Sequence, residues 1–129
     1  MRPVEADDRI YYDDVTAIRD SVRLTISDPD SWRNTWLSAT QAQVTPPPLP
    51  EVDFQRYMLI LVSAGSLKPG DEIHVDSVGL QGGRPVAVVR TTVACQPFPG
   101  TAYPLEIVRM RRSDSTVTFI ERQSKTEDC

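Results

Sequence analysis

The chain has 129 residues, a length that fits one domain, and its 40% hydrophobic and 25% charged residues are typical of a globular protein. Its 14 Lys and Arg residues against 18 Asp and Glu residues give a net charge of −4, and its few aromatic residues do not alternate with basic ones. This composition argues against binding to nucleic acid and provides no electrostatic attraction to anionic lipid.

Residues 1–14, "MRPVEADDRIYYDD", are expected to form a flexible N-terminal arm that is acidic and aromatic. They lack the apolar stretch of a signal peptide, so the chain is interpreted either as cytoplasmic or as a mature form whose leader has been removed. The arm is either a solvated terminus or a docking segment in which Tyr11 and Tyr12 lie against a partner.

A single β domain is expected over residues 15–122, followed by a polar tail at residues 123–129. Its first strand is predicted at residues 22–26, where apolar side chains alternate with Arg23 and Thr25. Such alternation is typical of a strand with one face in solvent.

A helix of about three turns is predicted over residues 29–40. Ser27 or Asp28 can cap its N-terminus, and a proline in its first turn loses no intrahelical hydrogen bond. Trp32 and Trp36 are four residues apart, so they share one face of the helix. We interpret this face as the surface that docks on a sheet; the alternative is that both tryptophans line a pocket for a small ligand.

The segment "QAQVTPPPLPEV" is interpreted as an internal spacer in the polyproline II conformation, with a PxxP ligand as the alternative. Soon after it comes "YMLILV", residues 57–62, which carries no charge. A membrane-spanning helix needs about 20 apolar residues, so this run is too short to be a transmembrane segment. We predict instead a central strand that is buried on both faces.

Turn signals at Pro69-Gly70 and Gly82-Gly83 separate further runs of β-branched residues after this strand. About five strands are expected after the helix and one or two before it, without strand–helix–strand alternation. The predicted fold is mainly β: an antiparallel β-sandwich or partly open barrel, with one short Trp-bearing helix packed on it.

No residue is assigned a catalytic role, and no metal or cofactor is expected. His74, the one histidine of the sequence, alternates with Ile73 and Val75 and is expected to point to solvent. The sequence has neither a GxSxG motif nor a CxxC pair. Cys95 and Cys129 are interpreted as two free thiols, with pairing between them left open.

The densest basic run is "RMRR", which lies on a predicted strand. It is either a solvated face that discourages pairing at a sheet edge, or a contact for an acidic partner through Arg109, Arg111 and Arg112. Together with Tyr11 and Tyr12, these arginines are the candidate partner-binding residues.

Several motifs follow one another along residues 18–121. They are the W-x3-W spacing of Trp32 and Trp36, the proline-rich link, "VDF" before the apolar strand, a Pro/Gly turn, a strand that ends at Cys95, and "TAYPLEIVRM". In this order the chain resembles the PrcB-type protease-complex subunit family (the PrcB C-terminal-like domain), which is common in bacterial cell-envelope proteins. The chain departs from the family in the shorter turn "GSLKPGDEI" and in having Tyr103 before Pro104.

The resemblance implies a non-enzymatic accessory subunit that stabilises or positions a larger envelope- or membrane-associated complex. It also implies an extracytoplasmic location, in the periplasm or cell envelope. We therefore predict a function in protein–protein interaction, with other protein subunits as partners, no nucleic acid, and no transmembrane segment of the chain's own. The alternative is a small-ligand-binding β module whose pocket lies near Trp32 and Trp36.

Overall fold

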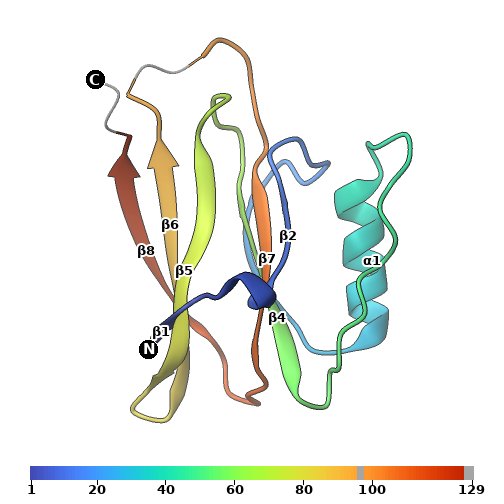
Figure 1. The fold of residues 1–129 in the computed structure, drawn as a ribbon, viewed down its shortest axis with the longest axis vertical. Helices are drawn as coiled ribbons and strands as arrows, with labels where there is room; N and C mark the ends of the chain where they lie inside the picture. The colour runs from blue at the N-terminus through green and yellow to red at the C-terminus, as the bar shows by residue number, and fades with distance from the viewer. Residues whose placement is uncertain (96–97, 127–129) are drawn as a thin grey trace.

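A computed structural model of the chain describes residues 1–95 and 98–126, which form two packed β-sheets and one α-helix (Figure 1). The elements are β1 (Arg2–Pro3), the 3-10 helix η1 (Ala6–Asp8), β2 (Arg9–Asp13), β3 (Ser21–Ile26), α1 (Pro29–Thr40), β4 (Tyr57–Ala64), β5 (Glu72–Gln81), β6 (Arg84–Val93), β7 (Leu105–Arg111) and β8 (Thr118–Lys125). The outer sheet has the order β1-β5-β6-β8 and the middle sheet the order β2-β7-β4-β3. The middle sheet lies between the outer sheet and α1 (Figure 1).

The two sheets form a β-sandwich in which each sheet keeps two edge strands, so the fold is not a closed barrel. The predicted mainly-β fold with one packed helix is confirmed. All strand pairs are antiparallel except β6 and β8, which run parallel. The exception follows from the topology, because the chain leaves the outer sheet after β6, returns through β7 of the middle sheet, and then enters β8.

Strand β4 is buried on both faces, as predicted. Every side chain from Met58 to Val62 is 0% exposed. Met58, Ile60 and Val62 face the core between the two sheets, whereas Leu59 and Leu61 face the core between the middle sheet and the helix. The absence of polar alternation in this run therefore reflects two apolar layers that meet at one strand.

Helix α1 covers the outer face of the middle sheet and matches the predicted residues. The Asp28 carboxylate accepts a hydrogen bond of 2.8 Å from the backbone N–H of Ser31, so Asp28 is the N-cap. Trp32 and Trp36 are 2% and 4% exposed and pack against the sheet, which confirms the docking interpretation. No helix within the described part of the chain has the length and apolar character that crossing a membrane requires.

The two tryptophans also hold the proline-rich link along the helix. The indole N–H of Trp32 donates to the carbonyl of Pro50 at 2.9 Å, and that of Trp36 donates to the carbonyl of Pro47 at 3.1 Å. Prolines cannot donate backbone hydrogen bonds, but their carbonyls accept them. The link is thus an internal spacer that is fixed to the helix at Pro47 and Pro50.

The hairpin predicted at Gly82-Gly83 joins β5 to β6 through a two-residue turn. Gln81 pairs with Arg84, and both glycines have positive φ, at 57° and 78°. Two successive residues with positive φ form the turn type that matches the twist of a two-residue hairpin. The sequence signal and the observed turn agree.

The N-terminal residues differ from the expected irregular arm, because they are paired into both sheets. Strand β1 pairs with β5, and β2 pairs with β7 as an edge of the middle sheet. Val4 is buried in the core between the sheets. These strands were not predicted because they are short and lack apolar alternation; their partners lie far away in the sequence. Strand β8 also extends beyond the expected domain limit at residue 122.

Candidate functional site

A buried carboxylate, that of Glu106 on β7, joins the two sheets at the side where β5 faces β2. Glu106 is 1% exposed. Its Oε1 accepts hydrogen bonds from Arg9 Nη1 at 2.7 Å and from the backbone N–H of Val75 at 2.8 Å, and its Oε2 lies 2.7 Å from His74 Nδ1. These partners come from β2 and β5, so one side chain connects three strands. We call Glu106, Arg9, His74 and Tyr12 the Glu106 cluster.

The topology explains why a carboxylate occupies this position. Strand β1 pairs with β5 only at Val78 and Ser77, so Val75 lies beyond the end of β1. Its backbone N–H therefore has no strand partner on that side, and the Glu106 carboxylate accepts its hydrogen bond instead. Glu106 thus accepts the backbone hydrogen bond that an adjacent strand would otherwise accept.

His74 does not point freely into solvent, contrary to the expectation from alternation. Its side chain is half-buried, its Nε2 lies 3.5 Å from Glu72, and the Tyr12 ring stacks on it with centroids 4.8 Å apart. The hydrogen bond with Glu106 raises the pKa of His74, and burial opposes that rise. Alternation along β5 could not reveal this, because the carboxylate comes from another sheet.

Tyr12 covers the Glu106 cluster from β2. Its hydroxyl is buried and makes no hydrogen bond among the described residues. Burial raises the pKa of Tyr12 to about 12, and the nearby charge of Glu72 adds to the rise. The nearby backbone of Ile73 lowers the pKa of Tyr12 in part, although its contact with the Tyr12 hydroxyl does not meet the geometry of a hydrogen bond. Tyr12 therefore stays neutral at physiological pH.

The contacts of the Glu106 cluster hold strands of the two sheets together. A carboxylate bonded to a histidine can orient that histidine as a general base, but a base also needs a nucleophile within hydrogen-bond distance. Among the described residues, no hydroxyl or thiol hydrogen-bonds His74, and no group of three or more acidic, histidine or cysteine side chains is placed to hold a metal ion. The cluster links strands, and the geometry assigns it no reaction.

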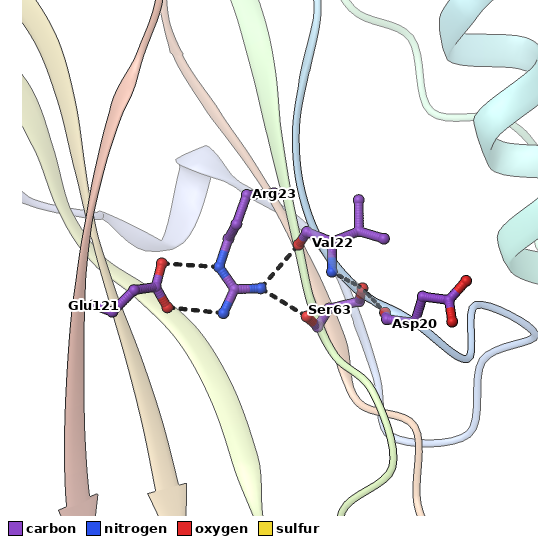
Figure 2. A network of polar contacts seen from close by, with 5 residues as sticks. All are labelled: Asp20, Val22, Arg23, Ser63 and Glu121. Carbon is purple, nitrogen blue, oxygen red and sulfur yellow. Dashed lines mark hydrogen bonds and ion pairs between the residues drawn. The ribbon is translucent and has the colours of Figure 1, made fainter.

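A second ion pair closes the opposite side of the sandwich, where β3 faces β8 (Figure 2). Arg23 Nε and Nη2 donate to the two carboxylate oxygens of Glu121 at 2.9 and 2.8 Å. Nη1 of the same arginine donates to the carbonyls of Val22 and Ser63 at 2.9 and 2.7 Å. Because the Glu121 side chain is 51% exposed, this bridge is more strongly screened by water than the Glu106 cluster.

Of the five candidate partner-binding residues, the two tyrosines are engaged within the fold. Tyr11 packs edge-on against Trp36, with ring centroids 4.7 Å apart, and its hydroxyl donates to Asp13 at 2.9 Å. Tyr12 belongs to the Glu106 cluster. The structure separates the pair, because neighbouring residues of β2 point to opposite faces of the middle sheet.

The three candidate arginines differ in their contacts. Arg109 pairs with Asp8 at 3.1 Å and lies 4.2 Å over the Tyr57 ring. Arg112 donates to the backbone carbonyls of Ser27 and Phe54 at 3.0 and 2.7 Å. Arg111 is exposed and has no ion pair or side-chain hydrogen bond with the described residues. Its guanidinium group is therefore available to a ligand.

Arg111 lies beside an open groove of about 490 Å³ at the end of the sandwich, which we call the end groove. It is lined by Met1, Arg2, Val78, Gly79, Leu80, Gly83, Met110, Arg111, Arg112 and Ser113. Sequence reasoning found Arg111 and Arg112 but missed Arg2 and the apolar part of the groove. The one signal was Leu80, an apolar residue beside a Gly-Gly turn, which is 61% exposed.

The alternative ligand site near the tryptophans is divided in the structure. Trp32 lines a groove of about 560 Å³ together with Pro29, Arg33 and residues 49–54, whereas Trp36 does not line it. The two rings contact each other, with centroids 5.4 Å apart, but both are buried and both indole N–H groups bind the proline link. They act mainly as packing residues.

The expectation of two free thiols is wrong for Cys95, which is not a free thiol. Its backbone N–H donates to the hydroxyl of Thr126 at 3.1 Å, which ties the end of β6 to the end of β8. Cys129 lies outside the described residues.

Comparison of the chain with protein-family models, with curated proteins and with solved structures found no match. The resemblance to the PrcB-type family accordingly stays a prediction based on the motifs.

Replacing Glu106 with Gln should lower the free energy of unfolding by about 2–3 kcal/mol, because the buried site would keep Arg9 and His74 without the charge that they bind. The matched control is Glu121→Gln, which also removes one carboxylate from an inter-sheet ion pair. That pair is partly exposed, so its loss should cost less than about 1 kcal/mol. Urea unfolding of both variants measures the difference, and equal losses would contradict the structural role of Glu106.

Stability should depend on pH through His74. Its pKa is raised in the folded protein above the ordinary value of 6.5, so its stabilising contribution is complete below that value and is lost as the pH rises through the folded pKa. The gap in urea midpoint between the natural chain and His74→Gln should therefore shrink from about pH 6 to about pH 9. His74 is the one histidine of the sequence, and the variant corrects for other titrating groups. A constant gap would show that the pair does not titrate in this way.

Proposed function

We propose that the chain is a non-enzymatic accessory subunit that binds another protein within a larger assembly. The observation that carries this proposal is the end groove, which combines exposed apolar side chains with Arg111, an arginine that no described residue pairs with. Concave apolar surfaces with a few well-placed polar groups are typical of binding sites. A binding role therefore suits this surface better than a catalytic one.

The contacts of the other charged residues support the same proposal. The Glu106 cluster and the Arg23–Glu121 pair both join the sheets, and Arg109 binds Asp8. These groups are already engaged in contacts inside the fold. The end groove, by contrast, contains a cation, Arg111, for which the described residues provide no ion pair or side-chain hydrogen bond.

The family resemblance also suggests where in the cell the assembly lies. It suggests that the assembly is associated with the bacterial cell envelope and that the chain is peripheral to a membrane complex, with other protein subunits as partners. The net charge of −4 agrees with a protein partner rather than a nucleic acid. Compartment and partners remain parts of the proposal.

The size of the native assembly tests the proposal. The chain would be tagged at its own locus, crosslinked in intact cells, extracted with mild detergent and separated on a native gel. We expect a discrete species much larger than the free chain, which crosslinking stabilises. The same tag on an unrelated protein is the control for detergent and tag effects. A chain that migrates only as a free monomer, with and without crosslinking, would contradict the accessory role.

A further inference from the structure

The end groove opens directly onto the core between the two sheets. It lies where β7 ends, beside the hairpin that joins β5 and β6 and next to the N-terminal strand (Figure 1). Val78 and Met110 form part of its surface and also belong to the inter-sheet core. An apolar side chain that entered the groove would therefore extend a core that already exists.

Two glycines line this end of the sandwich. Gly83, in the hairpin turn, has no neighbouring atom within 4 Å of the place where a Cβ would stand. Gly79 lies against Met1, and a Cβ there would come within 2.9 Å of the Met1 backbone. The two long sides of the sandwich are closed differently, by the Glu106 cluster and by the Arg23–Glu121 pair.

The charge of the groove is opposite to the charge of the chain. Three of its lining residues are arginines, and none of the described lining residues is Asp or Glu, although the chain carries a net charge of −4. Arg2 is partly neutralised by Asp8 at 3.3 Å, and Arg112 by Asp114 at 3.7 Å, while Arg112 also donates to backbone carbonyls. Arg111 keeps its full hydrogen-bonding capacity for a carboxylate.

We propose that the end groove binds an acidic segment of a partner protein, which inserts one apolar side chain against Val78, Leu80 and Met110 and presents a carboxylate to Arg111. This inference rests on the proposed accessory function and names the chemistry of the contact. A volume of about 490 Å³ fits an anchor side chain and its neighbours. The net charge of −4 gives the chain no attraction to an anionic membrane surface, and the planar Arg111 guanidinium matches the two oxygens of a protein carboxylate.

Charge reversal at Arg111 tests the carboxylate contact. Recovery of the partner with the tagged chain from crosslinked cells would be quantified for the natural chain and for Arg111→Glu. We expect recovery to fall by about 10-fold or more, because an attraction becomes a repulsion in a partly dry groove. The milder Arg111→Lys should retain most of the partner. The matched control is Arg122→Glu on β8, an exposed arginine outside the groove, which should leave recovery unchanged.

Leu80 provides an independent test of the apolar contact. Leu80→Asp should reduce recovery by a similar factor, since it adds a charge to the apolar wall and repels an acidic segment. Circular dichroism and thermal unfolding of each variant show that it is folded, as expected for exposed positions. A photo-crosslinking amino acid at position 80 should attach to a partner peptide that contains Asp or Glu near an apolar residue.

The outcomes distinguish this inference from the proposed function. If the partner is recovered equally with Arg111→Glu and Leu80→Asp, the end groove is not the binding site, and the accessory function stands. If only Leu80→Asp loses the partner, the carboxylate contact is overturned. Arg111-dependent sedimentation with phosphatidylserine vesicles would overturn the protein partner in favour of lipid. If the natural chain recovers no partner at all, the accessory function fails, and this inference fails with it.

Discussion

The double burial of β4 is the constraint on which the other layers depend. Met58, Ile60 and Val62 must be covered on one face and Leu59 and Leu61 on the other, and each large side chain contributes about 1.5–3 kcal/mol when it is removed from water. One sheet cannot cover both of its own faces. The outer sheet therefore covers the first face, and α1 with its two tryptophans covers the second. A sandwich with a helix on one side is the arrangement that satisfies this strand.

Because β4 has no polar face, it also limits where a charged side chain such as Glu106 can find partners. Glu106 pairs in register with Val62, next to the most apolar part of the sheet, and its carboxylate must find partners there. Arg9 provides one from β2 and His74 another from β5, so the buried charge holds β2 and β5 to β7. The fold thus uses its charged groups at the long sides and leaves the end near the β5–β6 hairpin open. We propose that this end is the place for binding, because its groove combines the exposed Leu80 with Arg111, which has no ion pair or side-chain hydrogen bond among the described residues.

Features that depend on neighbours in the sequence were predictable, and features that depend on distant residues were not. The α1 cap, the Trp face, the Gly82-Gly83 hairpin and β4 follow from spacing and propensity within a few residues. The environment of His74 depends on a residue 32 positions away, and that of Arg9 on one 97 positions away. The short strand β2 and the parallel pairing of β6 with β8 were not predictable for the same reason, because both depend on how distant strands are arranged in the sheets. The end groove also depends on how strand ends meet, so the sequence revealed only Arg111 and Arg112 among its lining residues.

The most direct test of the central claim, that β4 organises the fold, is a pair of charge insertions measured by circular dichroism and urea unfolding. Ile60→Asp places a carboxylate at a position that is 0% exposed, and Leu37→Asp makes the same kind of change on the exposed side of α1. We predict that Ile60→Asp abolishes the cooperative unfolding transition, because an unpaired buried charge costs a large part of a typical stability of about 5–15 kcal/mol. Leu37→Asp should shift stability by less than about 1 kcal/mol. A folded Ile60→Asp variant with a cooperative transition like that of the natural chain would contradict the account.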